Sequence, residues 1–114
     1  MGYKKTIQID FDGVLNNYNG KFDATILPTP KEGVKNFLIE LNKEFNIEIL
    51  TARNKIQVIL WLQRYNLLDY IVEVTNVKNP YASIFIDDRG LCFDGNYYNL
   101  LNKIKNFEPY WKEK

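Results

Sequence analysis

The sequence contains no histidine and only one cysteine. Without histidine, the chain cannot form Ser-His or Cys-His nucleophile systems, His-containing zinc sites or a histidine acid–base catalyst. The single cysteine, Cys92, excludes an internal disulfide bond. Catalysis by this chain would therefore depend on carboxylates, lysines, hydroxyl groups or a hard metal ion.

Long apolar runs and a strong net charge are also missing. No stretch is long and apolar enough to cross a membrane, and no charged-then-apolar leader is present, so we expect a cytoplasmic protein without a membrane partner. Fifteen basic and fourteen acidic residues leave a net charge of +1. No global field therefore attracts nucleic acid or an acidic partner, although a local basic patch remains open.

The 114 residues, 46% of them apolar, predict one compact domain over residues 1–114. Stretches with strand and helix patterns alternate through short loops, which predicts an α/β fold: a Rossmann-like three-layer sandwich with a mainly parallel central sheet. The predicted strands are residues 4–10, 46–50, 70–74 and 82–86, with a brief one at 91–93. The predicted helices begin at Thr29-Pro30, after an Asn54 cap, and at about Tyr98.

Two further segments have recognisable roles. Residues 13–29 follow neither a helical nor a strand period and are rich in turn residues, so we expect a hairpin-like flap. Its aromatic residues Tyr18 and Phe22 either stack on a bound base or sugar or pin the flap to the body. The aromatic tail from Phe107 to Trp111 is expected to fold back onto the domain, and Cys92 to be a buried, inert thiol.

Polar residues follow the ends of the predicted strands. Because the carboxyl ends of parallel strands meet at one edge of a sheet, residues far apart in sequence are expected to converge there. Several carboxylates without histidine suit a hard cation such as Mg²⁺, and a nearby lysine and hydroxyl suit a phosphate group. The residues concerned are Asp10, Asp12, Thr51, Asp87 and Asp88, with Lys78 in a loop.

In order and spacing these residues resemble the four motifs of the haloacid dehalogenase (HAD) superfamily of phosphohydrolases. The first motif is similar to D-F-D-G-V at residues 10–14, and the second to I-L-T at residues 49–51. Lys78 corresponds to the third motif and I-D-D at residues 86–88 to the fourth. Each motif is short, so the resemblance depends on their common order over nearly the whole chain.

The resemblance implies a role for each residue in the hydrolysis of a phosphomonoester. Asp10 is the nucleophile that forms an aspartyl phosphate, and Asp12 is the general acid and base. Lys78 neutralises charge on the nucleophile and the phosphate. Thr51 and the backbone N–H groups around Phe11 and Ala52 hold the phosphate oxygens.

The resemblance also implies Mg²⁺ as cofactor, held by the Asp10 carboxylate, the Asp12 backbone carbonyl and an aspartate of the fourth motif. It favours Asp88 as the direct ligand and gives Asp87 the task of fixing Lys78 or a metal-bound water. Arg53 and Arg89 follow the second and fourth motifs. Each is expected either to reach a substrate phosphate or base or to form a structural ion pair.

The spacing leaves no room for the lid domain that many HAD proteins carry, because residues 13–29 are enough only for a flap. Such a capless plan resembles deoxyribonucleotidases, polynucleotide-end phosphatases and small phage and bacterial HAD proteins, which implies nucleotides or nucleic-acid ends as substrates. An open site excludes water poorly, so either a large substrate or a neighbouring subunit of a homo-oligomer is expected to cover it.

Simpler interpretations exist for each motif. Asp12-Gly13 also suits a hairpin turn, Thr51 a helix cap, Lys78 a solvated surface residue and Asp87-Asp88 a polar turn. Because all of these would have to coincide in order, the sequence predicts a Mg²⁺-dependent phosphatase. The alternatives are a non-catalytic phosphate-binding or interaction protein on the same fold, and a phosphotransferase.

Overall fold

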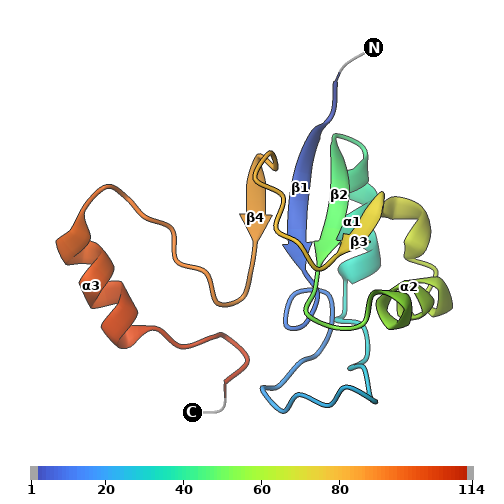
Figure 1. The fold of residues 1–114 in the computed structure, drawn as a ribbon, viewed down its shortest axis with the longest axis horizontal. Coiled ribbons are helices and arrows are strands. Elements are labelled where there is room, and N and C mark those ends of the chain that lie inside the picture. The colour runs from blue at the N-terminus through green and yellow to red at the C-terminus, as the bar shows by residue number, and fades with distance from the viewer. Residues whose placement is uncertain (1–2, 113–114) are drawn as a thin grey trace.

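The computed structural model describes residues 3–112, which form an α/β fold around a parallel sheet. The sheet of this part of the chain has four strands in the order β3-β2-β1-β4, and all neighbouring strands run parallel (Figure 1). The strands are β1 (Lys5–Asp10), β2 (Phe45–Leu50), β3 (Glu73–Thr75) and β4 (Ile84–Ile86). The predicted Rossmann-like α/β class is thus confirmed.

Apolar side chains alternate with polar ones along β1 and β2, and the face of the sheet that carries the apolar side chains is buried. Ile7 and Ile9 of β1 are almost completely buried, and parallel register places Ile47 and Ile49 of β2 beside them. Two helices supply the other half of this core: α1 (Val34–Asn42) with Val34 and Leu38, and α2 (Lys55–Arg64) with Val58, Trp61 and Leu62. Both helices therefore pack on the same face of the sheet.

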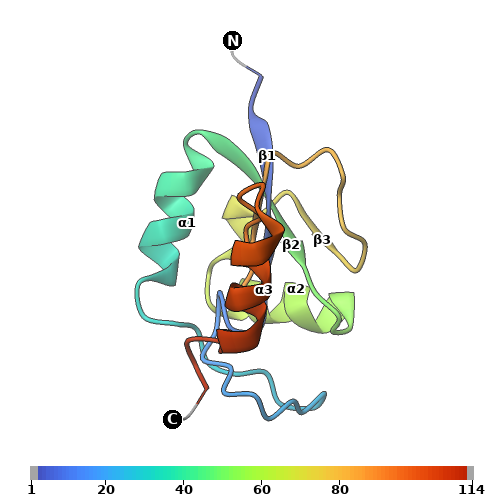
Figure 2. The same ribbon diagram turned by 90° about the vertical axis from the view of Figure 1, so that its left-hand side faces the viewer.

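The opposite face is covered by a loop instead of a helix. Gln8 of β1 is buried there because its side chain donates to the Val77 carbonyl and accepts from the Asn79 N–H. Asn79 also donates to the Glu48 carboxylate of β2. Figure 2 shows α1 on one side of the strands and the orange loop that precedes β4 on the other.

The first two helices begin differently. Asn54 caps α2 as predicted, since its side chain accepts hydrogen bonds from the N–H groups of Ile56 and Gln57. The predicted helix start at Thr29-Pro30 is wrong, because α1 begins at Val34. Residues 29–31 instead hold the base of the flap: Thr29 accepts from the Asn17 N–H, and the Lys31 N–H donates to Leu15.

The third predicted strand, residues 70–74, begins later than expected. A short 3-10 helix, η1 (Leu68–Tyr70), takes the first residue of that range, and β3 is confined to Glu73–Thr75. The flap, residues 13–29, has no regular element apart from an antiparallel bridge between Asn16 and Pro30 at its base. No folded lid is therefore found among the described residues.

The segment after β4 departs most from expectation. Residues 91–93 are not a strand, and Cys92 is exposed where a buried thiol was expected, because no neighbouring strand pairs with this segment. The third helix, α3 (Tyr97–Asn106), lies well apart from the sheet (Figure 1). None of the helices in residues 3–112 is long and apolar enough to span a membrane.

Candidate functional site

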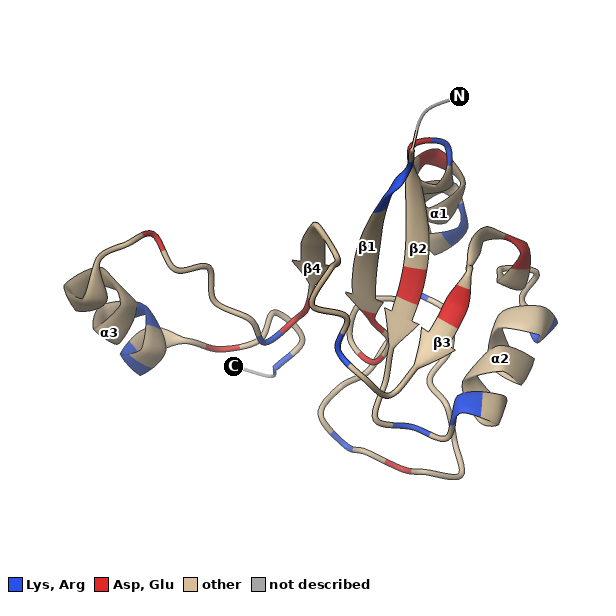
Figure 3. Cartoon of the chain, turned by 45° about the horizontal axis from the view of Figure 1, so that its top comes forward, with Lys and Arg blue, Asp and Glu red and all other residues tan. Residues whose placement is uncertain are grey.

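The carboxyl ends of β1 and β4 bring three aspartates together. Asp10 is the last residue of β1, and Asp87 and Asp88 directly follow β4, its parallel neighbour. One carboxylate oxygen from each of the three lies within 4.8 Å of the others. Figure 3 shows acidic segments in red at the ends of β1 and β4.

The proximity of these carboxylates changes their protonation. Burial raises the pKa of Asp10 to about 8, helped by a hydrogen bond with Asp88 and by the negative charge of Asp87. For Asp88 burial acts in the same upward direction, but hydrogen bonds from Trp111 and Asp10 outweigh it, and the pKa is lowered. The pKa values of the two carboxyls thus shift in opposite directions, and Asp10 takes up a proton more readily than Asp88.

Asp88 has one engaged and one free oxygen. The indole N–H of Trp111 donates to Oδ2, whereas Oδ1 is buried without a hydrogen-bond partner among the described residues. Asp87 is exposed and its Oδ1 accepts from the backbone N–H of Arg89 at 2.9 Å. A buried, unpartnered carboxylate oxygen beside two further carboxylates fits a hard divalent cation, which prefers oxygen ligands.

Glycine at position 13 makes room for this arrangement. Its φ is +85°, and a β-carbon there would collide with the Asp88 carboxylate and approach the Trp111 indole nitrogen. The Tyr110 hydroxyl also donates to the Gly13 carbonyl. The expected return of the Phe107 to Trp111 segment is thus confirmed, and its Tyr110 and Trp111 lie at the acidic cluster.

Asp12 does not join the three clustered carboxylates. Its Oδ2 accepts from Arg53 Nε at 2.8 Å, and its Oδ1 accepts from the Asn16 side chain at 3.2 Å. Arg53 is buried, and it also donates to the Asp23 carbonyl at 2.8 Å and lies 4.4 Å from the centre of the Phe22 ring. Of the two roles expected for Arg53, its contacts correspond to the structural ion pair, which ties the flap to the body.

The residues expected around the phosphate occupy different environments. Thr51 is buried, its N–H donates to the Thr75 carbonyl, and its hydroxyl accepts from the Arg53 N–H at 3.0 Å. Ala52 is exposed, whereas the Phe11 side chain is fully buried against Trp61. The Thr51 side chain therefore supports the turn that orients Arg53.

Lys78 lies in the loop between β3 and β4 and is exposed. Its ammonium group sits 4.4 Å above the Phe85 ring, and it belongs to no ion pair within residues 3–112. The bonds from Asn79 to Gln8 and Glu48 hold this loop against the sheet. The structure therefore does not bring Lys78 to the carboxylates.

Three site residues were not identified from the sequence: Trp111, Tyr110 and Asn16. Asn16 is fully buried, accepts from the N–H groups of Gly13 and Tyr18, and donates to Asp12. Aromatic residues in the tail predicted its docking but not its destination. Asn16 gave no signal, since an asparagine in a turn-rich stretch is ordinary.

Comparisons with protein-family models, with curated proteins and with solved structures gave no match. The chemical assignment therefore depends on the site itself. Its three carboxylates, which lie at the carboxyl ends of two neighbouring strands, can hold a divalent cation.

Proposed function

We propose that this chain is a Mg²⁺-dependent phosphomonoester hydrolase of the HAD type. The observation that carries the proposal is the convergence of Asp10, Asp87 and Asp88 at one sheet edge, with a buried Asp88 oxygen that lacks a partner among the described residues. The order of the HAD-like motifs along the chain supports the same assignment. The substrate class that fits an uncapped site is a nucleotide or a phosphorylated nucleic-acid end.

The proposed metal ligands are oxygen atoms of the acidic cluster, among them the unpartnered Asp88 Oδ1. Asp10 and Asp88 Oδ1 would bind Mg²⁺ directly, together with the backbone carbonyl of Asp12. Asp87, whose Oδ1 accepts from the Arg89 N–H, would orient the bound ion or its water. When bound, Mg²⁺ offsets the repulsion between these carboxylates and a phosphate group.

Asp10 is the nucleophile in the proposed reaction. One of its carboxylate oxygens attacks phosphorus, the bond between phosphorus and the leaving oxygen breaks, and the leaving oxygen takes a proton from Asp12. Water then attacks the aspartyl phosphate and gives a proton to Asp12. The bond between phosphorus and Asp10 breaks, which releases inorganic phosphate and restores both carboxyl groups.

Two residues have to move for this reaction. Asp12 must turn from Arg53 toward the substrate, and the Lys78 side chain must leave the Phe85 ring to reach a phosphate. For Asp12, this means breaking the ion pair with Arg53; for Lys78, it means leaving a loop position that Asn79 fastens to Gln8 and Glu48. When Asp12 leaves Arg53, the flap would also be affected, because Arg53 contacts the flap through the Asp23 carbonyl and the Phe22 ring.

A Mg²⁺-dependent phosphatase assay tests the proposal. The panel contains nucleotides, sugar phosphates and phosphorylated DNA ends, and phosphate release is measured with Mg²⁺ or with EDTA. Asp10→Asn is expected to lose at least about a thousandfold in kcat, because the nucleophile is removed. Asp69→Asn, at an exposed aspartate of η1, is the matched control and should retain full activity.

The position of Lys78 favours one rival, a phosphate-binding protein without catalysis, because the lysine does not face the carboxylates. That rival predicts phosphate binding without release of product from any substrate. Wild-type protein that turns over nothing on the panel, or Asp10→Asn protein as active as wild type, would overturn the hydrolase assignment. Formation of a phosphorylated alcohol when an alcohol acceptor is added would identify a phosphotransferase.

A further inference from the structure

The segment between Asp88 and Tyr110 is an arm that leaves the body and returns to the same place. We define the arm as residues 89–109. It begins directly after Asp88 and ends just before Tyr110 and Trp111, and the Trp111 indole N–H donates to the Asp88 carboxylate. Because of the arm, the radius of gyration is 15.2 Å, whereas a compact domain of this length has about 13 Å.

The helix of the arm has an apolar face without a partner. Tyr97, Leu100, Leu101 and Ile104 follow the spacing of one helical stripe, yet no residue of α3 is buried. Tyr97, Leu101 and Ile104 are 75%, 55% and 54% exposed. An isolated helix of fewer than about 12 residues is marginal in water, so α3 needs a surface to pack against.

The arm is nevertheless organised internally. Asn96 caps α3 by accepting from the Asn99 N–H, and Asp94 accepts from the Asn99 side chain. The rings of Phe93 and Tyr97 lie 5.1 Å apart. Such local bonds favour the start of the helix, but they do not replace the packing surface that α3 lacks.

The body has a matching uncovered face on the α1 side of the sheet. Ile84 of β4 is in register with Ile7 of β1 and shares its face, but Ile84 is 47% exposed and Ile7 only 2%. Phe37 of α1 is 42% exposed, and a hollow of 190 Å³ beside it is lined in part by Val14 and Val34. The edge strand lacks the helix that would complete its cover.

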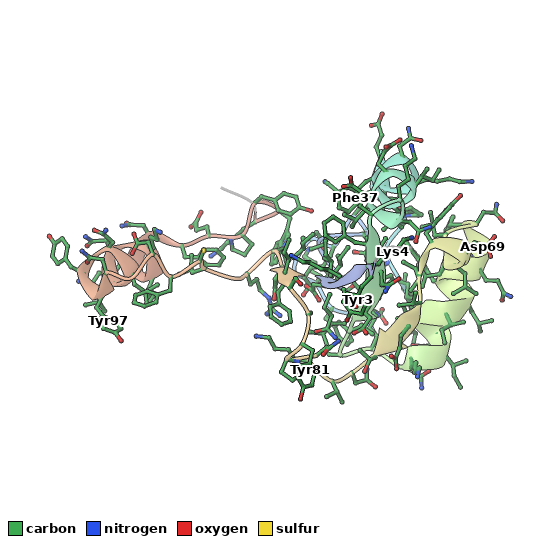
Figure 4. All side chains as sticks on the ribbon, turned by 90° about the horizontal axis from the view of Figure 1, so that it is seen from above. Tyr3, Lys4, Phe37, Asp69, Tyr81 and Tyr97 are labelled. Atoms are coloured by element: carbon green, nitrogen blue, oxygen red, sulfur yellow. The ribbon has the colours of Figure 1, made fainter. Side chains whose placement is uncertain are left out.

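Figure 4, seen from above, shows that the two surfaces do not meet within one chain. Tyr97 lies at the far end of the arm, and Phe37 lies on the body. Both ends of the arm are anchored at one corner of the body, through the bonds of Trp111 to Asp88 and of Tyr110 to Gly13. The helix thus projects away from its own body.

We propose that two copies of this chain form a symmetric dimer in which each arm packs its α3 stripe on the α1 side of the other body. A two-fold axis makes the contact twice and closes the assembly, because the donor and acceptor surfaces are on the same chain. The net charge of only +1 gives two copies little mutual repulsion.

The exposed area is sufficient for such a dimer. Four large apolar side chains of the arm, with roughly 100 Å² each to bury on average, give about 400 Å², and the surface that they cover on the other body would lose a similar area. Two symmetric contacts then bury about 1,600 Å², which is the usual size of a stable protein–protein interface.

Sedimentation velocity of the full chain, from about 1 to 100 μM, tests the proposal. Wild-type protein is expected to sediment at twice the 13.5 kDa chain mass. Leu101→Glu, in the middle of the stripe, should weaken the dimer at least about thirtyfold. Asn102→Glu adds the same charge on the opposite side of the helix and is the matched control, which should remain dimeric.

A mixing experiment then distinguishes arm-to-body contacts from arm-to-arm contacts. Leu101→Glu has a defective arm and Phe37→Glu a defective body face, so each alone should be monomeric. Mixed together, they can form a heterodimer through one intact arm and one intact face. Circular dichroism of each variant checks that the body is folded, since Leu101 and Phe37 are both outside the buried core.

Three results would overturn the proposal: a wild-type monomer over the whole concentration range, a Leu101→Glu variant as dimeric as wild type, or a mixture without heterodimer. The first would mean that α3 folds onto its own body, and the last that arms pair with arms. None of these outcomes depends on phosphatase activity, so the dimer and the proposed function are tested separately.

Discussion

At the scale of single residues, Asp10 carries the strongest electrostatic perturbation of the site. Burial and the neighbouring Asp88 and Asp87 raise its pKa to about 8, whereas an unfolded aspartate titrates near 3.9. Between about pH 4 and pH 8 the folded protein therefore binds one more proton than the unfolded chain. The stability of the metal-free protein should fall as the pH rises through this range.

Asp10→Asn removes this titration, so it should raise the melting temperature in EDTA at pH 8, on the order of 5 °C, and change it little at pH 4.5. The lowered pKa of Asp88 acts in more acidic solution and does not interfere with the comparison. Thermal unfolding at both pH values, with Asp69→Asn as control, measures the difference. Equal stabilisation at both pH values would contradict the assignment of the effect to the charge of Asp10.

Substitutions at Gly13 and Gly33 can separate two costs of adding a side chain: backbone strain and a steric clash with a neighbouring residue. Both glycines have positive φ, +85° and +87°, but a β-carbon at Gly33 meets nothing within 4 Å, whereas one at Gly13 strikes Asp88. We expect Gly33→Ala to lower the free energy of unfolding by about 1 kcal/mol, and Gly13→Ala by about 2–4 kcal/mol. Urea denaturation measures both values, and equal losses would show that Asp88 can move aside.

At the scale of elements, α2 positions both the core and the turn that carries Arg53. Its first turn depends on the Asn54 side chain, which accepts from the N–H groups of Ile56 and Gln57. Asn54→Ala should therefore lower the free energy of unfolding by about 1 kcal/mol. Lys55→Ala, at the adjacent exposed position, should change it by less than about 0.5 kcal/mol. Similar losses in the two variants, measured in urea, would argue against the cap.

The flap is held by side chains rather than by secondary structure. Arg53 joins Asp12 to the Asp23 carbonyl and covers the Phe22 ring, and Trp111 packs against Tyr18 with ring centres 5.1 Å apart. Of the two roles expected for Tyr18 and Phe22, the structure corresponds to the pinning role. The flap therefore depends on both Arg53 and the C-terminal tail.

At the scale of the whole molecule, the body and the arm differ in how they are stabilised. The body has a continuous core between the sheet, α1 and α2, whereas no residue of α3 is buried. In the Leu101→Glu variant, the amides of residues 97–106 should exchange with deuterium within seconds, while those of β1 and β2 remain protected for at least about a thousandfold longer.

Hydrogen exchange read by mass spectrometry measures this contrast. Wild-type protein at high concentration should show slower exchange in α3 than the variant does, because the second copy covers the helix. The Asn102→Glu variant is again the control and should behave as wild type. Equal protection of α3 in Leu101→Glu and wild-type protein would mean that the helix is stable without the other copy.

Several features of the fold and of the acidic cluster can be predicted from the sequence alone. Alternating apolar residues define β1 and β2, Asn54 marks the start of α2, and the aspartates follow strand ends, which in a parallel sheet necessarily share one edge. These features are local or follow from strand direction alone. The Mg²⁺-dependent phosphatase assignment is built on them and stays a prediction for the assay to decide.

Contacts between residues far apart in the chain could not be predicted from local sequence patterns and are seen only in the tertiary structure. It pairs Arg53 with Asp12, turns Lys78 toward Phe85 and brings Trp111 to Asp88, because each of these contacts joins residues far apart in the chain. It also begins α1 at Val34, since the backbone of residues 29–31 is bonded to the flap. Residues 91–93 have strand-like composition but no neighbouring strand, and a strand exists only where another one pairs with it.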